Sequence, residues 1–201
     1  IPSRGLGDVY KRQLVAFPLI ASMVLLAFVA NGTERMRQRL VAPIRMACLI
    51  FSLVMLTITT GMFFRYFGDV SWMNIAFNDY EYHFIYSWID ALGIHWAVGL
   101  DALSFPMVWL TTFLLPVTII ATWNEKHGAT YFPLLLMMGG ALIGVFVSLD
   151  LFMFYVFWEL TLIPMFFLIL KWGGKDRRYA AQKFFIYCLL YTSPSPRDGI
   201  G

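Results

Sequence analysis

Residues 148–167 read SLDLFMFYVFWELTLIPMFF, an apolar run that carries Asp150 near its start and Glu159 near its middle. At a rise of about 1.5 Å per residue, a helix places these two acids roughly 13 Å apart along its axis. If Asp150 lies at one face of a bilayer, Glu159 therefore lies close to the midplane. Pro164 follows five residues later, where it has no amide hydrogen to donate and its ring crowds the carbonyl of Leu160. This pattern predicts an irregular turn beside the acid.

A carboxylate at the depth predicted for Glu159 is costly, because insertion scales charge about 2.5–3.5 kcal/mol for an ionisable residue at the centre of a membrane helix. Such residues usually face a bundle interior and mark an ion or proton pathway. Two structural alternatives stay open. Glu159 can be a neutral, hydrogen-bonded packing residue, or it can lie on a lipid-facing helix and extend its carboxyl group toward the interface. The cost favours the ion pathway.

The composition of the whole chain indicates a membrane protein. Of its 201 residues, 60% are hydrophobic and 13% are charged, against about 25% charged residues in soluble domains. The net charge of +3 does not indicate a nucleic-acid partner, because the basic residues fall in short segments between apolar runs. Cys48 and Cys188 give neither a metal-ligand spacing nor a disulfide framework. We therefore expect an all-α, multi-pass membrane protein without a metal site.

Both ends of the chain are predicted to be foreign to the protein. Residues 3–13 (SRGLGDVYKRQ) and 188–198 (CLLYTSPSPRD) each resemble the translation of a transposon-derived sequencing adapter, and opposite strands of one DNA can encode both. The expected division is an adapter-like tail over 1–13, a truncated multi-pass module over 14–187 and a second adapter-like tail over 188–201. Native polar tails are the alternative.

About six apolar segments are predicted to cross the membrane. They cover roughly 14–31, 46–64, 101–123 and 131–147, a fifth follows the turn near 148–150 and ends near 170, and the sixth begins near Tyr179. The chain must turn back near 148–150, because the apolar character from 131 to 170 is twice what one helix needs. The basic loops at 32–45 and 171–178 then fall on one side, which the positive-inside rule assigns to the cytoplasm. The N-terminus is accordingly predicted to be outside.

The long connection from Arg65 to Gly99 is rich in Tyr and Trp and contains four acidic residues. Because Tyr and Trp prefer the headgroup boundary, it is predicted to be an interfacial segment on the outer side, partly helical or hairpin-like. His83 and His95 lie in it without a third ligand in a recognisable pattern, which favours interfacial polar groups over a metal site.

Two features inside the predicted spans concern helix geometry. Pro116 lies well inside the third span and predicts a kink there. Gly140 and Gly144 form a small-x-x-x-small pair in the fourth span. Such pairs let another helix approach closely, so these glycines indicate packing and not chemistry.

Three blocks in the second half of the chain carry a resemblance to a known family. They are GLDALSFP from Gly99, VFVSLDLFMFYVFWELTLIPMFFLI from Val145, and RRYAAQKFFIY from Arg177. Together they resemble the subunit M (chain 4) family of proton-pumping NADH-quinone oxidoreductase, respiratory complex I. The resemblance covers most of residues 85–187. The same superfamily includes subunits of multisubunit sodium/proton antiporters and membrane-bound hydrogenases, so the acid alone does not separate them.

The resemblance implies an antiporter-like proton-channel module in a membrane arm, with no redox site of its own. The family glutamate at the position of Glu159 is essential for pumping and pairs with a lysine on a later helix, expected beyond residue 187. Lys183 matches a family lysine on the sixth helix, and Asp150 and Asp101 match family acids of secondary rank. Because Lys183 lies near the predicted cytoplasmic end, extension of its ammonium group to the interface is the alternative.

The expected partners are other complex I membrane-arm subunits, the lipid bilayer and protons, in a bacterial cytoplasmic membrane. NADH, FMN, iron–sulfur and quinone sites are expected in other subunits, and no Gly-rich dinucleotide-binding turn occurs here. Enzyme activity is predicted only as part of NADH-quinone oxidoreductase. Two other functions stay open: a subunit of a Na+/H+ antiporter or membrane-bound hydrogenase, and a structural membrane subunit whose acid only packs.

Overall fold

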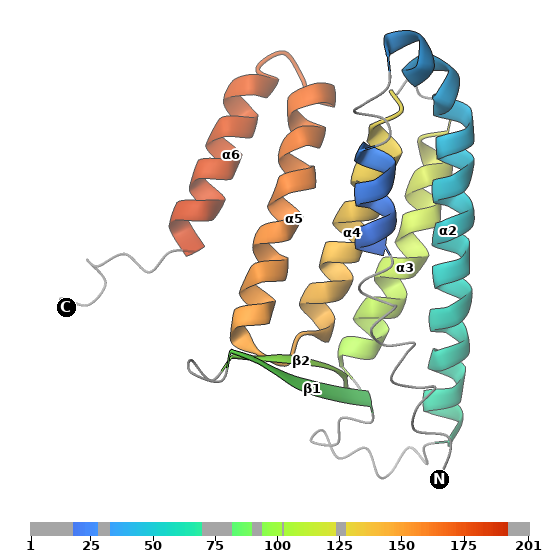
Figure 1. The fold of residues 1–201 in the computed structure, drawn as a ribbon, viewed down its shortest axis with the longest axis vertical. Coiled ribbons are helices and arrows are strands. Elements are labelled where there is room, and N and C mark those ends of the chain that lie inside the picture. Colours follow the sequence, from blue (N-terminus) through green and yellow to red (C-terminus); the bar gives the residue numbers. More distant parts are fainter. Residues whose placement is uncertain are drawn as a thin grey trace, which may run out of the picture.

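The computed structural model describes residues 18–27, 33–69, 82–89, 94–101, 103–123 and 128–192. In these ranges the chain forms six helices and one two-stranded hairpin (Figure 1). The helices are Pro18–Ala27, α2 (Glu34–Asp69), α3 (Ser104–Ala121), α4 (Tyr131–Val147), α5 (Leu151–Trp172) and α6 (Arg177–Thr192). The strands are β1 (Tyr82–Ile89) and β2 (Ile94–Leu100). Figure 1 shows α2 to α5 side by side, with α6 at the edge and the hairpin across one end.

Three of the described helices have the length and composition of membrane spans. Gln38–Phe64 within α2, together with α3 and α5, are long and apolar enough to cross a bilayer, and Pro18–Ala27 and α4 are shorter apolar helices. Many large apolar side chains on them point outward, and Leu151 is 83% exposed. A soluble protein would not expose so much apolar surface. The chain is therefore a multi-pass membrane protein, as predicted.

The predicted loop over residues 32–45 is wrong, because α2 begins at Glu34. This helix runs for 36 residues, passes through Pro43 and ends at Asp69, five residues beyond the predicted end of the span. Arginine is a good helix former, so a basic segment can continue a membrane helix into the interface. The sequence interpretation equated a charged run containing a proline with a loop.

The hairpin confirms the expectation of a hairpin-like element in the long connection. β1 and β2 pair antiparallel, with Tyr82 opposite Leu100 and Ser87 opposite His95. His83 lies opposite Gly99, so the backbones at His83 and His95 are about 13 Å apart along the sheet. The parts of this connection at 70–81 and 90–93 lie outside the described residues.

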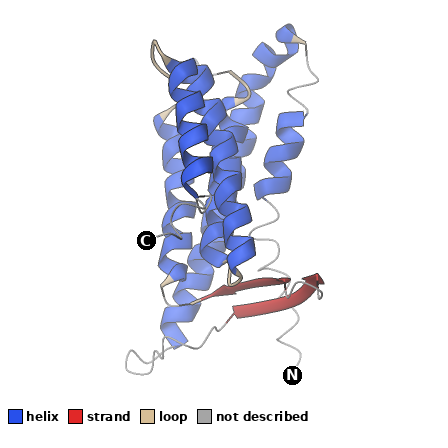
Figure 2. Cartoon of the chain, turned by 90° about the vertical axis from the view of Figure 1, so that its left-hand side faces the viewer, coloured by secondary structure: helices blue, strands red, loops and turns tan. Residues whose placement is uncertain are grey.

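The hairpin is fixed to the turn that precedes α5. Val98 forms a bridge with Ser148, and the N–H of Leu149 donates to the carbonyl of Ala97 at 2.9 Å. Figure 2 shows the two strands crossing the end of the helix bundle. The predicted return of the chain at 148–150 is confirmed, and α4 has the predicted bounds 131–147.

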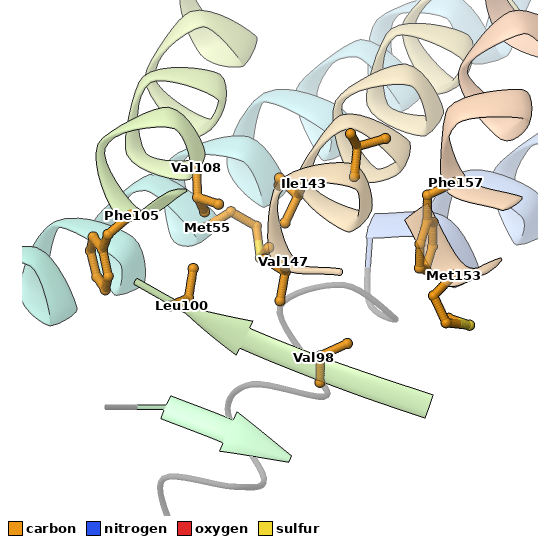
Figure 3. Close-up of a cluster of buried hydrophobic side chains, with 10 residues drawn as sticks. Met55, Val98, Leu100, Phe105, Val108, Ile143, Val147, Met153 and Phe157 are labelled. Atoms are coloured by element: carbon orange, nitrogen blue, oxygen red, sulfur yellow. The ribbon is translucent and has the colours of Figure 1, made fainter. Parts of the chain in front are cut away.

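A buried apolar cluster joins the hairpin to the helices (Figure 3). Its members come from α2, β2, α3, α4 and α5 and are Met55, Val98, Leu100, Phe105, Val108, Ile143, Val145, Val147, Met153 and Phe157. Because β2 and the first two turns of α5 share this cluster, the hairpin holds the start of the helix that carries Glu159.

The glycines of α4 are used for close packing, as predicted. Leu115 of α3 lies against Gly139, where a β-carbon would come within 2.6 Å of the leucine side chain. Gly140 faces Pro18 at the start of the first described helix, and Gly144 faces the ring of Phe157 on α5. α4 is therefore approached closely by three different helices. α3 continues as one helix through Pro116.

The last helix, α6, begins two residues before the predicted start at Tyr179 and continues to Thr192. The predicted division of the chain at 13/14 and 187/188 is a statement about the origin of the residues. A helical conformation does not test it, so this division stays a prediction.

Candidate functional site

Glu159 lies near the middle of a membrane-length helix. α5 has 22 residues, from Leu151 to Trp172, so Glu159 is within about 4 Å of the helix midpoint along the axis. Its side chain is partly buried. Pro164 is inside the same helix and buried, where it removes one backbone donor from the hydrogen-bond ladder. The structure thus places Glu159 near the middle of α5, and its depth in a membrane stays a prediction.

Lys183 lies at a different level from Glu159. The rings of Phe166 on α5 and Phe185 on α6 are 5.5 Å apart between centroids, which fixes how these antiparallel helices align. Counting the helical rise from this contact separates Glu159 and Lys183 by roughly 13 Å along the bundle. Side chains lean toward the N-terminus of their own helix, so these two lean in opposite directions. The described structure does not bring the two residues together.

The ammonium group of Lys183 is near the basic end of the bundle. Lys183 is exposed, and its Nζ lies 4.5 Å from the ring centroid of Tyr179, one turn earlier on α6. An aromatic ring holds a cation in this way through its quadrupole. The contact is what extension of the lysine toward the interface predicts, and a role in proton transfer stays a prediction.

Asp150 caps α5. Its carboxylate accepts hydrogen bonds from the backbone N–H groups of Phe152 at 2.8 Å and Met153 at 3.4 Å. These are among the first N–H groups of the helix, which have no partner within it, and the negative charge also suits the positive end of the helix dipole. The position of Asp150 is therefore explained by helix structure alone.

Asp101 plays a similar part before α3. Its carboxylate accepts from the N–H of Ser104 at 2.5 Å, and its own N–H donates to the Ser104 hydroxyl at 3.0 Å. This reciprocal pair is a capping box. Burial is the largest single influence and raises the pKa of Asp101, but the hydrogen bonds with Ser104 and with the backbone of Leu103 and Asp101 together outweigh it and hold the pKa below its ordinary value. Both secondary acids thus lie at the hairpin end of the bundle as caps.

Arg45 is a structural residue that the sequence interpretation placed in a loop. Its Nη1 donates to the carbonyl of Trp123 at 2.6 Å, and the guanidinium carbon lies 3.8 Å from the centroid of the Trp123 ring. This arrangement ties the first part of α2 to the turn that follows α3 and gives the Trp123 carbonyl a hydrogen-bond donor. The two residues are 78 positions apart, so no local pattern signals the contact.

Residues 148–194 match the model of the NADH:quinone oxidoreductase/Mrp antiporter transmembrane family. This range contains Asp150, Glu159 and Lys183. This part of the chain resembles that family.

Curated relatives place it near subunit M and chain 4 proteins. F(420)H(2) dehydrogenase subunit M of Methanosarcina mazei is 47% identical over 103 residues, which cover 50% of this chain and 21% of that protein. NAD(P)H-quinone oxidoreductase chain 4 of Prochlorococcus marinus strain AS9601 is 34% identical over 174 residues, covering 86% of this chain and 30% of the relative. The chain spans 20–30% of the length of such relatives. The predicted subunit M (chain 4) resemblance is confirmed.

Solved structures show the same fold. Respiratory complex I from Thermus thermophilus with bound NADH contains a chain that matches 90% of this one, and the match covers 33% of that chain, with a TM-score of 0.68 and 22% identity. The membrane-bound sulfane sulfur reductase, an archaeal respiratory membrane complex, matches with a TM-score of 0.61 and 15% identity, over 89% of this chain and 25% of that one. At these identities the likeness concerns the fold.

Proposed function

We propose that this chain is part of a proton-translocating membrane subunit of NADH-quinone oxidoreductase. It moves protons through a buried pathway that includes Glu159 and, in second place, Lys183, and this movement is coupled to NADH:quinone electron transfer in other subunits. The observation that carries the proposal is a partly buried carboxylate within about 4 Å of the midpoint of a membrane-length helix. That helix lies inside the residues that match the family.

Elementary electrostatics explains how such an acid can move a proton. Removal from water disfavours the charged form of a carboxyl group, and the approach of an ammonium group favours it. A cation that moves toward or away from Glu159 would therefore release or load one proton. Redox chemistry elsewhere in the complex would drive this movement of the cation through neighbouring subunits.

Lys183 is not placed for direct proton exchange with Glu159. The axial separation of roughly 13 Å exceeds the reach of one hydrogen bond, so transfer between them requires ordered water or a helix movement. The closer cation is proposed to come from a lysine on a later helix of the full-length subunit. Lys183 is then the next proton-carrying group of the proposed pathway, on the side of the basic turn at residues 171–178.

The proposal also covers the membrane and the subunits that surround the chain. The chain lies in a bacterial cytoplasmic membrane, packed against other complex I membrane-arm subunits and lipid. NADH, FMN, iron–sulfur clusters and quinone bind to other subunits, so this chain acts as part of an enzyme without a redox site of its own. Both solved relatives belong to respiratory complexes, which supports such partners.

The test is replacement of Glu159 by glutamine in the full-length subunit within the assembled complex. Pumping is measured as proton release per NADH oxidised in sealed vesicles. The family also includes Mrp antiporters, so sodium/proton antiport is the second candidate. If proton movement requires sodium, and sodium ions cross the membrane in the direction opposite to the protons, the antiporter function is correct and the coupled proton pump is not.

A further inference from the structure

Two threonines form a hydrogen bond in the buried contact between α2 and α3. The hydroxyl oxygens of Thr59 and Thr112 are 2.8 Å apart. The two residues are 1% and 0% exposed, and they are among the few polar side chains buried in the described part of the chain. A polar pair at this depth in a membrane protein holds its helices in one relative position, because both partners lose their bond if either helix slides.

Each hydroxyl also has an acceptor on its own helix. Thr59 can donate to the carbonyl of Met55 at 3.0 Å, and Thr112 can donate to the carbonyl of Trp109 at 2.9 Å. One threonine therefore donates to its helix while the other donates across the interface. If either residue loses its hydroxyl, the remaining one still has a carbonyl acceptor. A Thr→Val change thus removes the interhelical bond without leaving a buried donor unsatisfied.

A second bond supports the first at the same level. The indole Nε1 of Trp109 donates to the hydroxyl of Thr60 at 3.0 Å. The ring of Phe63 lies 5.5 Å from the Trp109 ring between centroids. The ring of Phe113, one turn later on α3, stacks on the Trp109 ring at 5.7 Å between centroids. Two adjacent residues of α2 are therefore bonded to α3 in a contact closed by aromatic rings.

The threonine pair and Glu159 lie at the same depth. Thr112 is one turn from Leu115, which packs on Gly139, and Glu159 is two residues from Phe157, which packs on Gly144. Counting the rise along α3, α4 and α5 from these contacts places Thr112 and Glu159 within about one helical turn of each other. The contacts that join α2, α3, α4 and α5 thus lie close to the level of Glu159 along the bundle.

We propose that the Thr59–Thr112 pair is a positioning element for Glu159. The pair fixes the axial position of α3 relative to α2. The close contacts of α4 with α3 at Gly139 and with α5 at Gly144 then fix the axial position of the turn of α5 that carries Glu159. This inference rests on the proposed proton-translocating function. Neither threonine contacts the transferred proton.

The experiment uses the full-length subunit in its complex. Thr59→Val and Thr112→Val are made singly and together, with Thr59→Ser and Thr112→Ser to restore the hydroxyl. Thr57→Val is the matched control, because Thr57 is exposed on α2 and donates only to the carbonyl of Leu53. Trp109→Phe removes the second interhelical bond while keeping an aromatic ring. The readouts are proton release per NADH and the rate at which a hydrophobic carbodiimide labels Glu159, followed by mass spectrometry across a range of pH.

The expected result is a change of about threefold or more in the labelling rate of Glu159 in the valine variants, with pumping reduced. The double variant should behave like either single one, because they remove the same bond. The serine variants and Thr57→Val should match the wild type. Assembled valine variants with wild-type labelling and pumping would overturn the inference. If one valine variant does not assemble, the other single variant decides by the same two readouts, because each removes the same bond. These outcomes leave the proposed function standing, since that function is decided by Glu159→Gln.

Discussion

The ring of Phe157 on α5 lies directly on Gly144 of α4, so close that a β-carbon at residue 144 would overlap the ring. Figure 3 shows Phe157 in the buried cluster between the helices and the hairpin. Since Glu159 follows two residues later, this contact sets the distance between α4 and the acidic turn of α5.

Replacement of Gly144 by valine should therefore separate α4 from α5. Overpacking of a tight core costs about 1–3 kcal/mol, so the assembled complex should be less abundant and melt at a lower temperature. Gly61→Val is the control, because no atom lies within 4 Å of a β-carbon at that glycine. An unchanged melting temperature for an assembled Gly144→Val complex would contradict the contact.

Asp150 is predicted to act as a helix cap. Asp150→Ala should lower stability by about 0.5–2 kcal/mol, because two N–H groups of α5 lose their acceptor. Asp150→Asn keeps an acceptor oxygen and should pump normally. A loss of pumping by Asp150→Asn at wild-type abundance would show that the charge itself is needed and that the cap is an incomplete description.

Arg45 is predicted to stabilise the junction of α2 and α3. Arg45→Lys keeps the charge but cannot keep both the bond to the Trp123 carbonyl and the stacking on the ring. It should destabilise the subunit by about 1–3 kcal/mol, measured by thermal unfolding in detergent. Arg39 on the same helix is exposed, and Arg39→Lys should leave the unfolding temperature unchanged.

Much of this architecture follows from the sequence because the membrane restricts it. The largely apolar stretch from 131 to 170 is too long for one span, so its length predicts the turn at 148–150, and Glu159 then falls near the middle of α5. The helical start of α2 was not predicted, because charge does not distinguish an interfacial helix from a loop. Contacts such as Thr59–Thr112 and Arg45–Trp123 join distant residues, and one sequence carries no signal for such pairs.

Lys183 should matter less than Glu159, since the two lie roughly 13 Å apart along the bundle and the lysine is held over Tyr179. Lys183→Gln should reduce proton release per NADH only in part, and Lys183→Arg should restore it. Complete loss of pumping in an assembled Lys183→Gln complex would show that the lysine exchanges protons with the acid directly and that the helices move to allow it.

The most direct measurement is proton release per NADH oxidised by sealed vesicles that contain the complex with Glu159→Gln in the full-length subunit. Glutamine has nearly the same size as glutamate and cannot carry a proton, so it separates transport from packing. Abolished or sharply reduced proton release, in a complex that is assembled and still oxidises NADH, is the predicted result. Normal proton release from that complex would contradict the role of Glu159.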